Sequence, residues 1–188
     1  MTSRRILGVD PGLTRCGVGV VEVGKNRSVS FLDVDTIRTE NSLELDERIG
    51  RIAKALSDKF DTFKPDLVAL ERVFAQQNLR TVMGVAQISG VVLLMANQRG
   101  IPIQLHTPSE VKAAVTGSGR ANKDQVGFMV AKLLGLKEIP KPADAADALA
   151  IAITAGWRPT AEVSVGNLTK AQEAWRKAEA ASKKSRRA

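Results

Sequence analysis

The first forty positions alternate between short apolar runs and turn residues. Residues 6–10 form an apolar run that ends at Asp-Pro-Gly, which predicts a buried strand followed by a turn. Residues 16–23 are rich in Val and Gly, and residues 29–38 place Ser, Asp and Thr between apolar positions, so both segments are predicted to be strands. Because only short turns separate the three segments, we expect an antiparallel meander.

The rest of the chain alternates between helical and strand-like patterns. Apolar positions from Ile49 to Phe63 recur with a period of 3.6, which predicts a helix from residue 42 that Pro65 ends. Further strands are predicted at 66–73 and 102–106, and further helices at 78–99, 109–115, 123–134 and 143–155. This order is typical of a ribonuclease H-like α/β fold, with a five-stranded mixed sheet and helices on both faces. We expect this domain to occupy residues 1–158.

The predicted helix at 78–99, which Gly100 closes, is apolar around nearly its whole circumference. Such a helix needs cover on every side. One side can face the sheet, and the other requires either more of the same chain, as in a central core helix, or a second subunit. We favour the second interpretation and predict that this helix forms a dimer contact.

Composition limits the chemistry that the chain can support. Cys16 is the only cysteine and His106 the only histidine, which excludes an intramolecular disulfide, a thiolate cluster and zinc sites rich in His or Cys. We expect Cys16 to be a small buried hydrophobic residue and His106 to form hydrogen bonds at the end of a strand. A bound metal must therefore be held mainly by oxygen, which favours Mg²⁺ or Mn²⁺.

The net charge of +8 is concentrated near the C-terminus. Residues 170–188 carry seven Lys or Arg and two Glu, whereas the other 169 residues carry 21 basic and 18 acidic side chains. We expect residues 159–188 to be a basic, Ala- and Lys-rich tail, flexible or partly helical, that either binds nucleic acid or aids solubility. The N-terminus shows no signal-peptide pattern, and no uninterrupted apolar run is long enough for a bilayer, so we expect a cytoplasmic protein without membrane association.

Two acidic residues stand at the ends of predicted strands. Asp10 is either a turn-stabilising residue before Pro-Gly or part of a site. Glu71 ends the apolar segment 67–70, although Glu is depleted in strands and an unpaired buried Glu is costly. A salt bridge would explain Glu71 without a site, but the side chain of the adjacent Arg72 points to the opposite face of a strand.

Asp144 and Asp147 lie three residues apart among alanines, so a helix carries both carboxylates on one face. The helix dipole favours an Asp near a helix N-terminus, which explains Asp144 better than Asp147, and we expect no basic residue nearby to neutralise the pair. Two like charges about 4 Å apart repel by about 4 kcal/mol at an effective dielectric near 20. Converging with Asp10 and Glu71, the pair would raise carboxylate pKa values or bind divalent metal. Two Mg²⁺ ions in such a site, with Mn²⁺ as a substitute, suit phosphodiester hydrolysis.

Four segments then occur in order: Gly8-Val-Asp-Pro-Gly12, Leu70-Glu-Arg-Val-Phe74, Lys112 through Gly117-Ser-Gly119 to Lys123, and Ala143-Asp-Ala-Ala-Asp-Ala-Leu-Ala150. Together they resemble the RuvC family, the bacterial crossover-junction endodeoxyribonucleases, over about residues 5–157. The resemblance implies a homodimer that resolves four-way (Holliday) DNA junctions in recombination and repair, with the branch-migration proteins RuvA and RuvB as partners. It places the family's catalytic metal ligands at Asp10, Glu71, Asp144 and Asp147.

The resemblance also marks residues for DNA contact. Phe74 matches a family aromatic that stacks on a junction base, and it precedes a polar stretch where a large apolar side chain is otherwise out of place. The alternative is that Phe74 packs under its own loop. Lys112 and Lys123 match basic positions near the family's active site, and Lys123 follows Asn122, a candidate N-cap at a helix end where phosphate can bind. Arg120 is a further candidate beside them.

Two other functions fit parts of the sequence. Asp10, Gly12 and Thr14 also resemble the phosphate loop of sugar kinases and heat-shock ATPases, but those enzymes need two such domains and give Asp144 and Asp147 no role. A non-catalytic DNA-binding protein, or a ribonuclease H-like relative with another substrate, would use the basic tail equally well. Cleavage of different nucleic acids distinguishes these cases.

Overall fold

Residues 3–72 and 79–158 are described by the computed structural model of this chain. The strands are β1 (Arg4–Asp10), β2 (Arg15–Val23), β3 (Val29–Arg38), β4 (Leu67–Glu71) and β5 (Ile103–His106). They form one mixed sheet in the order β3-β2-β1-β4-β5. The β1–β2 and β2–β3 pairs are antiparallel, which confirms the predicted meander, and the β1–β4 and β4–β5 pairs are parallel. The carboxyl ends of β1, β4 and β5 therefore meet at one edge of the sheet.

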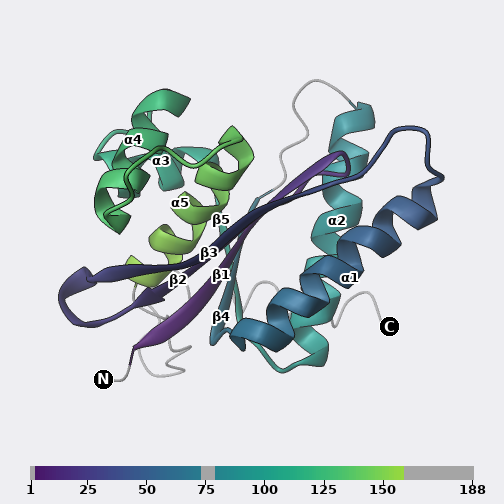
Figure 1. Cartoon of the computed structure of the whole chain (residues 1–188), viewed down its shortest axis with the longest axis horizontal. Coiled ribbons are helices and arrows are strands. Elements are labelled where there is room, and N and C mark those ends of the chain that lie inside the picture. The colour runs from purple at the N-terminus through teal and green to yellow at the C-terminus, as the bar shows by residue number, and fades with distance from the viewer. Residues whose placement is uncertain (1–2, 73–78, 159–188) are drawn as a thin grey trace, which may run out of the picture. The chain divides into compact units, whose positions relative to one another are not determined.

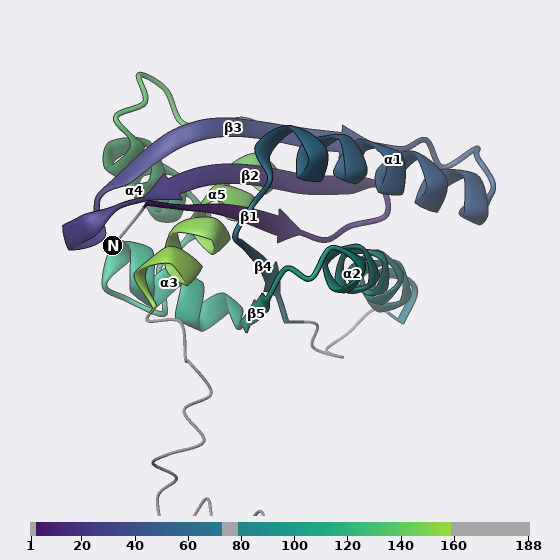
Figure 2. The same cartoon turned by 90° about the horizontal axis from the view of Figure 1, so that it is seen from below.

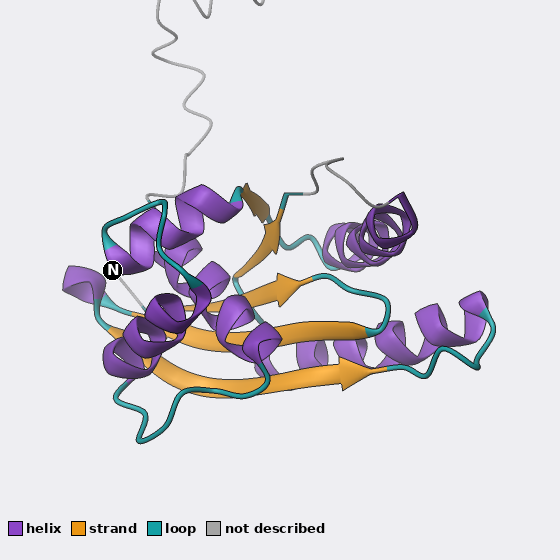
Figure 3. Ribbon diagram, turned by 90° about the horizontal axis from the view of Figure 1, so that it is seen from above, coloured by secondary structure: helices purple, strands orange, loops and turns teal. Residues whose placement is uncertain are grey.

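Helices cover both faces of this sheet (Figures 1 and 2). One face carries α1 (Leu45–Phe63) and α2 (Leu79–Gln98), and the other carries α3 (Pro108–Thr116), α4 (Lys123–Leu134) and α5 (Ala143–Trp157). Figure 3 shows the same layers from the side opposite to that of Figure 2. A short 3-10 helix, η1 (Lys25–Arg27), connects β2 to β3. The predicted ribonuclease H-like α/β architecture is thus confirmed.

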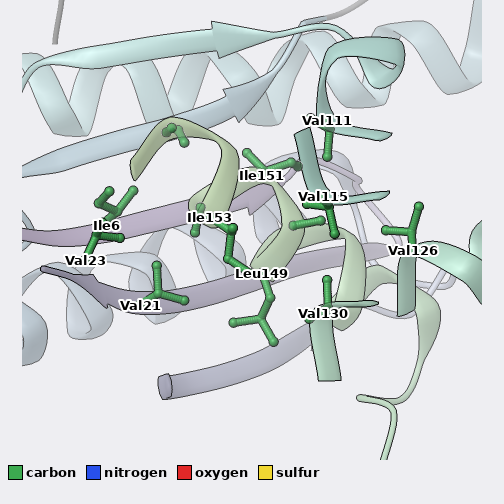
Figure 4. Packing of buried hydrophobic residues seen from close by; sticks show 14 of the residues in the cluster. Ile6, Val21, Val23, Val111, Val115, Val126, Val130, Leu149, Ile151 and Ile153 are labelled. Atoms are coloured by element: carbon green, nitrogen blue, oxygen red, sulfur yellow. The ribbon is translucent and has the colours of Figure 1, made fainter. Parts of the chain in front are cut away.

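The helix α5 lies very close to the sheet because glycines line its path. A Cβ added to Gly8 would lie 2.2 Å from the Ala148 carbonyl oxygen, and a Cβ added to Gly17 would lie 2.1 Å from the Asp144 carbonyl oxygen. Valines of α3 and α4 and isoleucines of α5 close the core on this side (Figure 4). This packing fixes the height of α5 above β1 and β2, and with it the position of the acidic residues near the N-terminus of α5.

The helix α2 buries one side and exposes the other. Ile88, Val92 and Ala96 belong to the core that α1 and the sheet complete, whereas Met83 and Leu94 are each 57% exposed. Residues 81–98 are long and apolar enough to cross a membrane, with a mean hydropathy of 1.3. A single helix of this kind does not establish a membrane span, and the third of it that is buried packs into the core against α1 and the sheet. The dimer contact expected on its exposed side stays a prediction.

Most helix and strand boundaries agree with those predicted from the sequence, but the predicted start of α1 is wrong. The helix expected from residue 42 begins at Leu45, because the preceding residues form a turn in which the Leu43 N–H donates to the Glu40 carbonyl oxygen at 3.4 Å. The strand predicted over 66–73 is observed over Leu67–Glu71, and residue 73 lies outside the described part of the chain. The tail expected at 159–188 also lies outside it.

Candidate active site

Asp10 and Glu71 end two adjacent parallel strands, β1 and β4, which are paired in register up to the preceding residues. Side chains alternate between the two faces of a sheet. Ile6 and Leu67, four residues earlier in their strands, belong to the core beneath α5. By this alternation Asp10 and Glu71 point to the α5 side of the sheet, at its carboxyl edge.

Asp144 and Asp147 approach the same edge from α5. Both are half-buried, with side chains 17% and 24% exposed, and the two alanines between them, together with Ala148, are buried. The carbonyl oxygen of Asp144 lies directly over Gly17 of β2, the residue that pairs with Asp10. The fold therefore brings together four carboxylates that are distant in the sequence.

The pKa values of the two strand-end carboxyls reflect this arrangement. Burial, followed by the carboxylates of Glu71, Asp147 and Asp144, raises the pKa of Asp10 from 3.8 to about 7, against a smaller opposing effect of Lys123. Burial and then the Asp147 carboxylate also raise the pKa of Glu71. Glu71 forms no ion pair within the described residues, so the simple salt-bridge explanation of this residue does not hold.

The expectation that no basic residue lies near the α5 pair is wrong. The Arg15 Nε lies 3.1 Å from the Asp144 Oδ2, and the Lys123 Nζ lies 3.2 Å from the Asp147 Oδ2. The Asp147 carboxylate is the main cause that raises the pKa of Lys123. Neither base is near α5 in the sequence. Arg15 begins β2 and Lys123 begins α4, and only the tertiary fold brings them to the carboxylates.

These ion pairs bear on metal binding. Among residues 3–72 and 79–158, no group of three or more acidic, Cys or His side chains is arranged to hold an ion. Two of the four carboxylates are instead oriented toward a base, while Asp10 and Glu71 form no ion pair among the described residues. The four carboxylates are thus close enough to interact electrostatically, but their oxygens do not converge on one point.

A cavity of about 720 Å³ opens beside the carboxylates. Asp10 and Asp144 form part of its wall, together with Arg15 and the loop that joins β1 to β2. The remaining wall comes from the segment before α1, from Arg48 in the second turn of α1, and from the first half of α2. Neither Arg15 nor Arg48 belongs to a recognisable motif, so neither residue could be selected from the sequence alone.

The predicted DNA-contacting residues occupy different places. Lys112 is close enough to Glu71 to lower the pKa of that carboxyl, and Lys123 pairs with Asp147, so both lie beside the carboxylates. Asn122 caps α4 as expected, accepting the Gln125 N–H at 2.9 Å. Arg120 lines a separate hollow of about 480 Å³ between α3 and α4, whose wall includes none of the four carboxylates. Phe74 lies outside the described residues.

The lone cysteine and histidine have no part in this site. Cys16 is fully buried, as expected, and burial raises the pKa of its thiol to about 12. The expectation for His106 is wrong. Its side chain is buried at the end of β5, but neither ring nitrogen has a hydrogen-bond partner among the described residues. Burial and the nearby Arg158 cation both lower the pKa of His106, which favours the neutral ring.

The fold and the site define the chain as a ribonuclease H-like α/β protein with an acidic site at the carboxyl edge of two parallel strands. Its residues 6–155 match the family model described as crossover junction endodeoxyribonuclease RuvC. Since this match spans most of the sequence, the chain belongs to the RuvC family.

Individual relatives agree with this assignment. A crossover junction endodeoxyribonuclease RuvC from Paenarthrobacter aurescens (strain TC1) is 56% identical over 186 residues, which cover 97% of this chain and 98% of the relative. The enzyme of the same name from Clavibacter sepedonicus is 60% identical over 154 residues, 82% of this chain and 76% of the relative. Among solved structures, T. thermophilus RuvC in complex with a Holliday junction substrate superposes with a TM-score of 0.76 at 37% identity, covering 80% and 92% of the two chains.

Proposed function

We propose that this chain is a structure-selective endonuclease that resolves Holliday junctions by metal-dependent hydrolysis of phosphodiester bonds, in homologous recombination and DNA repair. Family membership along most of the chain, and the similarity to a RuvC structure that holds junction DNA, support the activity and the substrate. The observation that carries the assignment of the site is the gathering of Asp10, Glu71, Asp144 and Asp147: burial, and then the three neighbouring carboxylates, raise the pKa of Asp10 to about 7.

Mg²⁺ is the proposed cofactor, with Mn²⁺ as a substitute and two ions in each active site. The site fits such ions, because the four residues offer only carboxylate oxygens, the donors that hard divalent cations prefer. Burial raises the pKa of Asp10 most, and the neighbouring carboxylates raise it further; a bound cation would relieve this carboxylate repulsion. When bound, the ions polarise the phosphate and activate water. Asp10, Glu71, Asp144 and Asp147 would hold them.

Arg15 and Lys123 bind first the carboxylates and then the DNA phosphates. Arg15 and Lys123 neutralise Asp144 and Asp147 in the structure. If the carboxylates held metal, the Arg15 guanidinium and the Lys123 ammonium group would be free to bind the DNA phosphates. Lys112, which lies near Glu71, adds a third cation. These bases hold the cleaved strand against the carboxylates and compensate the charge that accumulates on the phosphate.

The exposed side of α2 is the proposed homodimer contact. Met83 and Leu94 lie 11 residues apart, three turns along one side of the helix, and both are large, apolar and exposed. Two active sites in a dimer would cut two opposing strands of one junction. We propose RuvA and RuvB as the branch-migration partners, and the cytoplasm, where chromosomal DNA lies, as the compartment of the enzyme.

Three predicted DNA contacts lie farther from the carboxylates or outside the described residues. We propose that Phe74 stacks on an unpaired base at the junction. Arg120 adds a phosphate contact on the α3–α4 side of the molecule. The domain of residues 1–158 would be sufficient for cleavage, with the basic tail of residues 159–188 adding affinity for DNA that depends on salt.

Cleavage of a four-way junction, a linear duplex and an RNA–DNA hybrid with Mg²⁺ tests the proposal. We expect paired nicks in the junction and little cleavage of the other two substrates. Asp10→Asn should abolish cleavage and leave junction binding intact or tighter, because it removes a negative charge near phosphate. Asp58→Asn, which is exposed on α1 and pairs with Lys54, is the matched control. Equal cleavage of the linear duplex would contradict the proposal.

A further inference from the structure

The Arg48 guanidinium is held in place between three segments of the chain. Its Nε donates to the Thr39 hydroxyl at 2.9 Å, and its Nη2 donates to the Thr14 hydroxyl at 2.8 Å. The Thr14 hydroxyl in turn donates to the Asn41 Oδ1 at 3.3 Å. The Thr39 N–H donates to the Thr14 carbonyl oxygen at 3.1 Å. The loop after β1, the segment after β3 and the first turns of α1 are thereby joined around one cation.

Among the described residues, the Arg48 cation has no carboxylate partner. Within the part of the chain that the structure describes, no carboxylate forms an ion pair with Arg48, and both of its side-chain hydrogen bonds go to neutral hydroxyls. Glu47, its neighbour in α1, pairs with Arg51 at 2.8 Å. A guanidinium carries five N–H donors, of which these bonds use two. A rigidly held arginine with free donors is suited to bind an external anion.

The position of Arg48 indicates which anion this is. Arg48, Thr14 and Asn41 line the cavity of about 720 Å³ whose wall also includes Asp10 and Asp144. Arg15, the other base in this wall, already pairs with Asp144. The Asn41 side chain adds an amide N–H₂ donor beside the guanidinium. Arg48, Asn41 and two of the four carboxylates therefore line the same cavity.

Arg48 also lies on the opposite side of the sheet from the lysines assigned to DNA. Lys112 and Lys123 belong to α3 and α4, whereas Arg48 belongs to α1, on the other face (Figure 1). The four carboxylates lie at the sheet edge between these two layers. A DNA strand that crosses the edge, with its scissile phosphate at the carboxylates, would meet the lysines on one side and Arg48 on the other.

We propose that Arg48, Thr14 and Asn41 form a second phosphate site, which binds a backbone phosphodiester of the cleaved strand away from the scissile one. Arg48 and the Asn41 amide donate to the phosphate oxygens, and Thr14 holds Arg48 in position. This inference rests on the proposed function, since it takes DNA as the occupant of the cavity. Two phosphates anchored on opposite sides of the scissile bond fix the direction of the strand across the site.

Salt dependence of junction binding tests this site. In EDTA, which prevents cleavage, Arg48→Gln should weaken junction binding by about 10-fold, because it removes a charge-assisted contact. It should also reduce the slope of log K against log[salt] by about 0.9, the value for one phosphate neutralised. Arg51→Gln removes the same charge from an exposed position of α1 and should leave the slope unchanged. Equal slopes for Arg48→Gln, Arg51→Gln and the wild type would overturn the proposal.

A neutral phosphate analogue gives a second, independent readout. Methylphosphonate substitution at single positions of the cleaved strand removes one backbone charge at a time from the DNA. At one position the substitution should weaken the wild type and have no further effect on Arg48→Gln. If the losses from the substitution and from Arg48→Gln add at every position, the assignment is overturned. The scan of the wild type also tests the proposal if Arg48→Gln folds poorly. In the wild type, at least one phosphate other than the scissile one must be sensitive to the substitution. Failure of the wild type to prefer a junction would instead contradict the proposed function.

Discussion

The raised pKa of Asp10 makes a quantitative prediction about stability. In the folded protein without metal this pKa is about 7, against the ordinary value of 3.8 for an Asp carboxyl, which applies in the unfolded chain. Below pH 3.8 the carboxyl is protonated in the folded and unfolded states, so the folded state is not penalised. As the pH rises toward 7, the unfolded chain loses this proton while the folded protein keeps it. The folded protein is therefore destabilised progressively, and above pH 7 the penalty is complete.

The substitution Asp10→Asn removes this penalty by keeping the group neutral at every pH. The rise in the Asp10 pKa from 3.8 to about 7 corresponds to about 4 kcal/mol, at about 1.36 kcal/mol for each pKa unit. The variant should therefore be more stable than the wild type by up to about 4 kcal/mol at pH 8.5. At pH 5 the expected gain is about 1.7 kcal/mol. The gain should therefore increase by about 2.5 kcal/mol between these two pH values.

Urea unfolding in EDTA, followed by circular dichroism at pH 5 and pH 8.5, measures this difference. Asp58→Asn is the control, since the Asp58 side chain is 67% exposed and pairs with Lys54 on the same helix. Addition of Mg²⁺ at pH 8.5 should stabilise the wild type and leave Asp10→Asn nearly unchanged, which reduces or reverses the gain. A gain that is the same at both pH values, or a loss of stability in Asp10→Asn, would refute the argument that burial and the neighbouring carboxylates destabilise the charged form of Asp10.

Three further substitutions test other parts of the account. Gly17→Ala would place a Cβ 2.1 Å from the Asp144 carbonyl oxygen. Thermal unfolding should therefore show a loss of about 1–3 kcal/mol in the free energy of unfolding, and cleavage should be reduced. The control Gly50→Ala, in open space on α1, should instead raise the free energy of unfolding by about 1 kcal/mol. Leu94→Lys should convert a dimer to a monomer in analytical ultracentrifugation without a change in helical content, and a dimer that persists would place the subunit contact elsewhere. Phe74→Ala should slow junction cleavage in single-turnover assays at an unchanged melting temperature, whereas a large loss of stability would assign Phe74 to the core.

The strand-end carboxylates could be recognised from the sequence because their physical signature is local. Asp10 and Glu71 each follow an apolar run, and parallel strands bring such ends together at one edge. Asp144 and Asp147 could be grouped because helical spacing places residues three apart on one face. In each case the periodicity of a single element contains the information, and the RuvC-like motifs indicated which elements meet.

The partners of these carboxylates could not be predicted in the same way. Arg15 pairs with Asp144 only because Gly17 lets α5 approach β2 closely, and no pattern within either segment encodes that distance. Arg48 has the spacing of an ordinary surface residue of α1, and its contacts with Thr14 and Thr39 depend on how two loops fold back on the helix. Long-range proximity of this kind requires the tertiary structure.

Manganese located in crystals of the protein with an uncleaved junction gives the most direct test of the central claim, that four carboxylates form a single metal site. Anomalous diffraction at the manganese edge identifies the ions without reference to the protein atoms. The account predicts manganese within bonding distance of carboxylate oxygens from Asp10, Glu71, Asp144 and Asp147, with Arg15 and Lys123 no longer paired to Asp144 and Asp147. Manganese bound elsewhere, or a junction-bound site in which those ion pairs persist and no metal is present, would contradict it.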